Sequence, residues 1–299
     1  MDKVKIIFLG TGSSIPTKKR SHPAVLFQFK DENILIDCGE GTQRQFRIGN
    51  LNPCKLTRIL ITHWHGDHVL GLPGLLQTLA LNGYNKTLEI YGPETSKKMI
   101  DLYQKLFVHE EKISISCHDI SGKFFETEDF YIEAEKMAHN VPSLAYSLIL
   151  KGRTRLDKDK LNKLNLQKSP LIGELKKGKT IKLNGKKICG KNLIFKEPER
   201  KVTLILDTVY NANCKKIAKN SDLLICESSY SADEKELAKE RFHLTSEQAG
   251  KIAKESKSKK LILTHLSQRY DANSQIILEQ AKKIFSNTIL ANDFDEIEI

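Results

Sequence analysis

The chain has 299 residues, of which 39% are hydrophobic and 28% are charged, and its formal net charge is +11. This balance is typical of a folded globular protein and excludes an intrinsically disordered chain, and the length allows one large α/β domain or two smaller ones. Apolar runs stay far below the roughly eighteen residues of a membrane span, and the run at residues 6–9 is too short for a signal peptide. We therefore expect a cytoplasmic protein with no membrane segment.

Apolar strands alternate with amphipathic helices along most of the chain. Strands are predicted at residues 4–9, 24–29, 33–37, 58–62, 88–91, 113–117, 130–136, 144–150, 202–206, 222–226 and 260–264. Helices are predicted at residues 42–48, 72–82, 96–107, 213–219, 245–256 and 274–285. The surplus of strands in the first half favours two packed sheets covered by helices over a single doubly wound sheet.

One segment interrupts this alternation and carries the basic character of the chain. Residues 151–201 contain 17 Lys and Arg against 5 Asp and Glu, a local net charge of +12, whereas the rest of the chain holds 31 basic and 32 acidic residues. The segment is either a solvated charged insertion or an arm that binds a polyanion. Clustered lysines favour the second interpretation, because they bind a phosphate backbone independently of sequence.

The strongest chemical signal is the cluster His63-Trp64-His65-Gly66-Asp67-His68, which follows a predicted strand. In extended chain, alternate side chains point the same way, so His63 and His65 can hold one metal ion. Gly66 then lets the chain turn, which brings Asp67 and His68 toward a second position nearby. Imidazole and carboxylate ligands at this spacing suit Zn²⁺ or a similar transition-metal ion.

Three further polar residues at predicted strand ends, His139, Asp207 and His265, are candidates to complete two sites. Taken singly, each could equally be a capping or hydrogen-bonding group. Together with the cluster they predict one ion on His63, His65 and His139, and a second on Asp67, His68 and His265. Asp207 would bridge the two ions, an arrangement that suits attack on a phosphodiester.

The chain resembles the metallo-β-lactamase superfamily and, within it, the short form of the ribonuclease Z family. The resemblance covers nearly the whole chain and is carried by the cluster at residues 63–68, by the three strand-end residues above, and by the segments at residues 8–12, 37–43, 207–208 and 243–245. The segment Pro16-Thr17-Lys18-Lys19-Arg20 is similar to the PxKxRN loop of that family. The resemblance implies an α/β fold, the αβ/βα four-layer sandwich. Residues 1–150 and 202–299 would form the catalytic domain, and residues 151–201 an inserted basic, flexible arm.

The resemblance also implies an activity, namely zinc-dependent removal of 3′ trailers from precursor tRNA. The cut would follow the discriminator nucleotide and leave a 3′-hydroxyl on the tRNA and a 5′-phosphate on the trailer. Two Zn²⁺ ions per chain and a homodimer are expected. Asp67 would be the general base, and His243, supported by Glu227, would protonate the leaving oxygen; alternatively, His243 only packs over the start of the following helix.

Substrate contacts follow from the same resemblance. They are expected at Pro16, Lys18 and Arg20 near the cut, and at Lys158, Lys160 and Lys163 on the arm, which would grip the folded tRNA.

Two other classes stay open at this point. The first is a dinuclear-metal phosphodiesterase that acts on small substrates on the same scaffold, although such substrates have no use for a basic insertion of this size. The second is a non-catalytic RNA-binding protein, which would not need a complete ligand set or Asp67.

Overall fold

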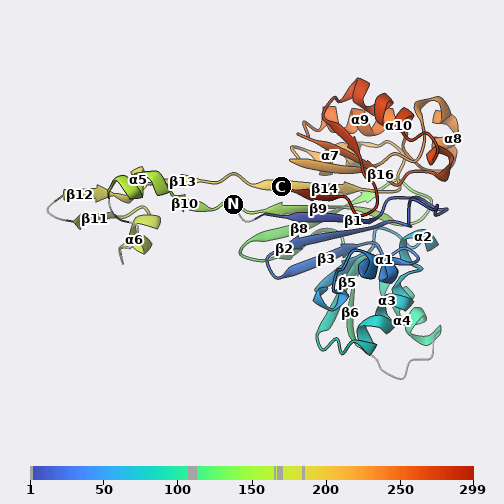
Figure 1. Cartoon of the computed structure of the whole chain (residues 1–299), viewed down its shortest axis with the longest axis horizontal. Coiled ribbons are helices and arrows are strands. Elements are labelled where there is room, and N and C mark those ends of the chain that lie inside the picture. The colour runs from blue at the N-terminus through green and yellow to red at the C-terminus, as the bar shows by residue number, and fades with distance from the viewer. Residues whose placement is uncertain (1–2, 107–112, 165, 167–170, 184–185) are drawn as a thin grey trace. The chain divides into compact units, whose positions relative to one another are not determined.

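The computed structural model describes residues 3–106, 113–164, 166, 171–183 and 186–299. These form two compact units (Figure 1). The larger unit comprises Met1–Phe125, Ile132–Leu148 and Lys201–Ile299, and the smaller unit comprises Glu126–Tyr131 and Ile149–Arg200. The smaller unit takes in most of the basic segment at residues 151–201. No helix among the described residues combines the length and apolar character needed to cross a bilayer.

Two seven-stranded mixed sheets form the centre of the larger unit. The first has the order β18 (Glu296–Glu298), β1 (Lys5–Gly10), β2 (Ala24–Phe29), β3 (Glu32–Ile36), β4 (Arg58–Leu60), β5 (Thr87–Gly92) and β6 (Ser114–Asp119). The second has the order β17 (Thr288–Leu290), β16 (Leu261–Thr264), β15 (Leu223–Glu227), β14 (Arg200–Ile205), β9 (Ser143–Leu150), β8 (Phe130–Met137) and β7 (Gly122–Glu126). Strands β3 to β6 run parallel to one another, and so do strands β14 to β17. The carboxyl ends of each parallel set therefore meet at one edge of their sheet.

Helices cover the outer face of each sheet (Figure 1). The first sheet is covered by α1 (Thr42–Ile48), α3 (Leu72–Leu81) and α4 (Ser96–Leu106), and the second by α7 (Ala212–Ala218), α9 (Ser246–Glu255) and α10 (Gln275–Ile284). The short helices α2 (Gly66–Val69) and α8 (Lys235–Glu240) lie in connections. The layers are helix, sheet, sheet and helix, so the predicted four-layer αβ/βα sandwich is confirmed.

The smaller unit has its own secondary structure and a small core. Strand β10 (Thr154–Leu156) pairs with β13 (Ile194–Lys196), and β11 (Thr180–Leu183) pairs with β12 (Lys186–Cys189). Its helices are α5 (Lys158–Lys163), which Asp157 caps by accepting the amides of residues 159 and 160, and α6 (Ile172–Lys176). Leu161, Leu166, Leu175 and Leu193 pack together as its core. The basic segment is therefore a folded element among its described residues.

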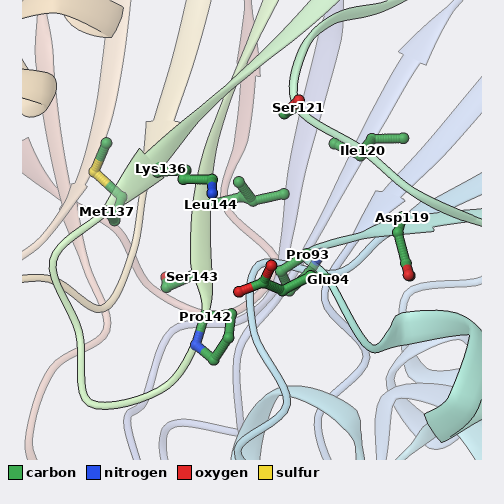
Figure 2. Close-up of a pocket in the computed structure, with 10 residues that line it drawn as sticks. All are labelled: Pro93, Glu94, Asp119, Ile120, Ser121, Lys136, Met137, Pro142, Ser143 and Leu144. Carbon is green, nitrogen blue, oxygen red and sulfur yellow. The ribbon is translucent and has the colours of Figure 1, made fainter.

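A pocket of about 250 Å³ opens near the ends of strands from both sheets (Figure 2). Pro93 and Glu94 after β5, and Asp119 and Ile120 at the end of β6, form one side of it; the other side comes from the end of β8 and the start of β9. None of the predicted metal ligands lines this pocket. It is therefore separate from the candidate site described below.

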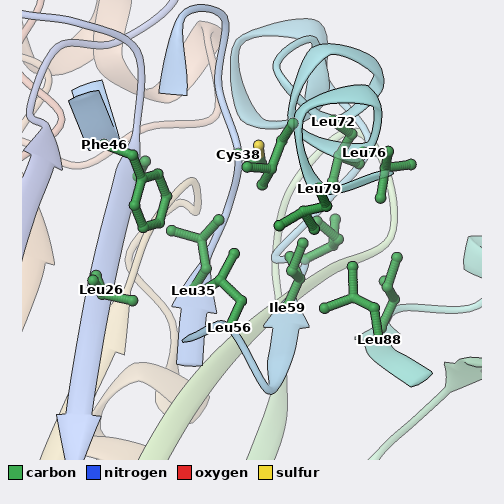
Figure 3. Packing of buried hydrophobic residues seen from close by; sticks show 14 of the residues in the cluster. Leu26, Leu35, Cys38, Phe46, Leu56, Ile59, Leu72, Leu76, Leu79 and Leu88 are labelled. Carbon is green, nitrogen blue, oxygen red and sulfur yellow. The ribbon is translucent and has the colours of Figure 1, made fainter. Parts of the chain in front are cut away.

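The first sheet and its helices share a continuous apolar core (Figure 3). Leu26 and Leu35 from the strands face Phe46 on α1, and Leu72, Leu76 and Leu79 project from α3 toward the same core. These side chains recur at the three- and four-residue spacing that places them on one helix face. This packing fixes β3 and β4, whose carboxyl ends lead into the candidate site.

We expect Leu35→Ala to lower the free energy of unfolding by about 3 kcal/mol, because this fully buried side chain would leave a cavity in the core. Leu81→Ala is the matched control, since that leucine is 80% exposed, and its effect should stay below about 0.5 kcal/mol. Urea denaturation followed by circular dichroism measures both. Equal losses of stability in the two variants would contradict the packing in Figure 3.

Candidate metal centre

The predicted ligands come from strand ends of both sheets. The cluster at residues 63–68 follows β4 in the first sheet. In the second sheet His139 follows β8, Asp207 follows β14 and His265 follows β16. Because these strand ends meet at the same edge of the sandwich, residues far apart in the sequence reach one place.

A first group brings together His63, His65, His139 and Asp207, whose ligand atoms all lie within 4.8 Å of one another. His65 Nδ1 lies 3.1 Å from His63 Nε2 and 3.2 Å from His139 Nε2. Asp207 Oδ2 lies 3.5 Å from His63 Nε2. Three imidazole nitrogens and one carboxylate oxygen therefore face a common point.

A second group brings together Asp67, His68, Asp207 and His265 within the same limit. His265 Nε2 lies 3.2 Å from His68 Nε2 and 3.2 Å from Asp207 Oδ1. Asp67 Oδ2 lies 3.3 Å from His68 Nε2. Asp207 thus offers one carboxylate oxygen to each group, the shared position predicted from the sequence.

The charges of these residues fit a bound cation. Asp207 is buried, and its Oδ1 has no hydrogen-bond partner in the described part of the chain. Burial opposes its charge, yet the surrounding imidazoles, first His265 and then His68, hold its pKa well below the ordinary value. Burial and the neighbouring His68 lower the pKa of His63 well below the ordinary value. A bound cation would take over the positive charge that the imidazoles provide here, and it binds a neutral imidazole and an ionised carboxylate, so this donor set suits a transition-metal ion.

Asp37 orients one of these ligands and was missed in the sequence analysis as a site residue. Its carboxylate is fully buried, accepts hydrogen bonds from the Thr62 amide and hydroxyl at 2.7 Å each, and lies 2.7 Å from His68 Nδ1. The Nε2 atom of His68 is thereby directed into the second group. A signal was present, because Asp37 directly follows β3, the parallel neighbour of β4.

The half-buried His243 and the buried Glu227 form a pair beside the second group. Glu227 ends β15, accepts the Thr208 amide at 2.9 Å, and lies 3.1 Å from His243 Nδ1. Burial opposes a charge on His243, but Glu227 and then Asp207 raise its pKa to about 9. His243 also lies just before Thr245, the residue that caps α9, so its position is compatible with either interpretation from the sequence.

Ser229 is a further residue that the sequence did not reveal. Its hydroxyl donates to Glu227 Oε2 at 2.7 Å and lies 2.9 Å from His265 Nδ1. It therefore links the pair His243 and Glu227 to a ligand of the second group.

The loop that carries Pro16, Lys18 and Arg20 runs beside His265. The amide of Ser13 donates to the Leu266 carbonyl at 3.1 Å. Pro16 and Lys18 are exposed. The Arg20 guanidinium lies inside the protein and donates to the Thr11 hydroxyl, the Ala291 carbonyl and the Asn292 side chain at 2.6–2.9 Å. Its contacts hold the loop in place, a different task from the substrate contact expected from the sequence.

The three arm lysines lie in the smaller unit, on helix α5. Lys158, Lys160 and Lys163 are all exposed. The Lys160 ammonium donates to the Asn192 carbonyl at 3.0 Å. Their side chains present positive charge to solvent within this unit.

Comparisons with known proteins find ribonuclease Z relatives, solved structures of the metallo-β-lactamase fold and one further family model. A ribonuclease Z from Methanosarcina mazei is 35% identical over 99% of this chain and 98% of its own length, and one from Lactobacillus helveticus is 38% identical over 99% and 98%. Among solved structures, the short form of human tRNase Z has a TM-score of 0.71 and 28% identity over 98% of both chains. The metallo-β-lactamase fold protein YhfI from Bacillus subtilis also has a TM-score of 0.71, at 22% identity over the full length of both chains. A family model described as Anti-Pycsar protein Apyc1 matches residues 4–171.

We expect Asp37→Asn to weaken metal binding by roughly 10- to 100-fold. Both carboxylate oxygens of Asp37 accept hydrogen bonds, so an amide would leave either His68 Nδ1 or the Thr62 amide without an acceptor, and the imidazole ring would lose its fixed orientation. Zinc titration by calorimetry measures the affinity. Asp31→Asn, at an exposed position a few residues earlier, is the control and should bind zinc like the unaltered protein. Equal affinities of all three proteins would refute this role of Asp37.

Proposed function

This chain belongs to the ribonuclease Z family, and we propose that it removes 3′ trailers from precursor tRNA by cutting after the discriminator nucleotide. The products would be a tRNA with a 3′-hydroxyl and a trailer with a 5′-phosphate. The observation that carries this proposal is the pair of ligand groups that share Asp207, in a chain similar over its whole length to ribonuclease Z proteins.

Two zinc ions are the proposed cofactors. One ion would be held by His63, His65 and His139, and the other by Asp67, His68 and His265. Asp207 would be a ligand of both ions. Zinc bound in this way polarises a phosphoryl oxygen and lowers the pKa of a bound water molecule.

The protein's own groups orient the reactants and move the protons. Asp67 would orient the attacking water and accept its proton. Burial opposes its charge, but His68 lowers the pKa of Asp67 and keeps the carboxylate ionised. His243, held by Glu227 at Nδ1 and protonated at neutral pH, would give a proton to the leaving 3′ oxygen of the tRNA.

Recognition of the tRNA is assigned to two surfaces. Pro16 and Lys18 on the exposed loop beside His265 would contact the 3′ end, with Arg20 holding the loop. The smaller unit would bind phosphates of the folded tRNA through its exposed lysines. The working form would be a cytoplasmic homodimer. A phosphodiesterase for small substrates would need the metal centre but not a basic unit, which is why the tRNA substrate is preferred.

We expect Asp67→Ala to abolish cleavage of a precursor tRNA that carries a 3′ trailer, with little loss of tRNA binding. The reason is that this residue both orients the water and holds an ion. Gel analysis with mapping of both new ends measures cleavage, and filter binding measures affinity. An unaltered protein that leaves the precursor intact, yet hydrolyses a small phosphodiester, would contradict the tRNA assignment.

We expect replacement of Lys158, Lys160 and Lys163 by alanine to weaken tRNA binding and to reduce the slope of log K against log salt by up to about 3. Hydrolysis of a small chromogenic phosphodiester should be unchanged. The matched control replaces Lys97, Lys98 and Lys105, three exposed lysines on α4 of the larger unit, and should bind tRNA normally. Equal loss of both activities in the arm variant would show that this surface is not a separate binding site.

A further inference from the structure

Phe242 holds an aromatic ring next to the metal centre. It lies between helix α8 and His243. Its carbonyl oxygen accepts a hydrogen bond from His139 Nδ1 at 3.1 Å, and its ring centroid lies 6.1 Å from that of His139, with the ring planes at 86°. The Nε2 atom of the same imidazole faces the first ligand group. The phenyl ring therefore lies directly beside one of the proposed ligands, His139.

The backbone at Phe242 has a conformation that glycine adopts more easily. Its φ angle is +59°, in the left-handed region. Helix α8 ends in a pattern in which the His243 amide donates to the Ala238 carbonyl at 2.8 Å, and the residue at the position of Phe242 in this pattern is usually glycine. A bulky residue here is strained, and strain of this kind is concentrated at functional sites.

The ring of Phe242 is also open to solvent. The residue is 39% exposed, whereas the other aromatic residues in the described part of the larger unit are buried or half-buried. An exposed ring stabilises the apolar core little. The strain and the exposure together indicate a side chain whose partner is outside the protein, and its place beside the ligands indicates that this partner belongs to the substrate.

We propose that Phe242 stacks on an unpaired nucleobase of the RNA, the discriminator base next to the cut. This inference rests on the proposed function, which places the phosphate that follows this nucleotide at the metal centre. Aromatic side chains bind unpaired bases by stacking, whatever the sequence. The neighbouring residue, His243, is the group assigned to the 3′ oxygen of the same nucleotide, so adjacent side chains would contact its base and its sugar.

The test couples a change in the protein to a change in the RNA. Phe242→Asn removes the ring, but asparagine tolerates a positive φ, so the carbonyl that accepts from His139 keeps its place. Phe242→Trp keeps a stacking surface. The substrates are a precursor tRNA, the same RNA with an abasic discriminator nucleotide, and the same RNA with an abasic first trailer nucleotide. Steady-state cleavage gives kcat and KM for each combination of enzyme and substrate.

We expect Phe242→Asn to lower kcat/KM on the intact precursor about tenfold, mainly through KM, and Phe242→Trp to restore it. The abasic discriminator should lower the kcat/KM of the unaltered enzyme by a similar factor. It should hardly change the kcat/KM of Phe242→Asn, because the substitution and the abasic nucleotide remove the same stacking contact. Leu102→Asn, which replaces another exposed apolar side chain far along the sequence on α4, is the control and should behave like the unaltered enzyme.

Three results would overturn the inference. The first is an unchanged kcat/KM in Phe242→Asn. The second is that Phe242→Asn and the abasic discriminator each lower kcat/KM and that the two factors multiply when the changes are combined, as a general disturbance of His139 would produce. The third is that the effect of Phe242→Asn on kcat/KM disappears only on the RNA with the abasic first trailer nucleotide. An unaltered enzyme that does not cut the intact precursor would overturn the proposed function, and this inference with it.

Discussion

The carboxylate of Asp207 is the constraint around which this molecule is organised. It is almost completely buried, and imidazole nitrogens of five histidines lie within 4.0 Å of its oxygens, namely those of His63, His68, His139, His243 and His265. An isolated charge at this depth would be strongly destabilising, so the site needs positive charge close to it. His243, whose pKa is raised to about 9, supplies one positive charge, and metal ions held between the other imidazoles and the carboxylate would supply more.

This requirement explains why the residues around the ligands are also polar and fixed. The first sheet provides Asp37 and Thr62 behind His68, and the second provides Glu227 and Ser229 behind His265 and His243. Each of these groups is fully or almost fully buried and has a hydrogen-bond partner. The strand ends hold them rigidly, because the helices outside the sheets and the core in Figure 3 leave the strands no freedom to move apart. A precise set of ligands thus depends on apolar packing several residues away.

Sequence patterns predicted the parts of the site that local spacing determines. The cluster at residues 63–68 consists of six consecutive residues, so its chemistry could be inferred directly from their spacing. Asp207 and His265 were found because each follows an apolar strand. Asp37 has the same signal, yet its task depends on β3 lying beside β4, and pairing between strands is not encoded in a local pattern. The position of Arg20 is set by Ala291 and Asn292, some 270 residues later, so its burial could not be predicted.

The packing of the smaller unit is another feature that local sequence patterns could not predict. Its composition indicated mainly charge, because Leu161, Leu175 and Leu193 are too far apart in the sequence to form a recognisable pattern, although they pack together in the folded unit.

The division of charge between residues 151–201 and the rest of the chain has a physical reason. The metal centre depends on buried carboxylates, and a lysine ammonium close to them would compete with the metal ions for the same oxygens. Attraction for a polyanion is therefore better placed on the basic segment at residues 151–201, whose net charge of +12 acts over a distance of about one Debye length, roughly 10 Å. Salt screens that attraction but hardly affects interactions among buried groups. Under the proposed function, binding of the RNA and chemistry at the metal centre would consequently respond differently to ionic strength, although one chain carries both.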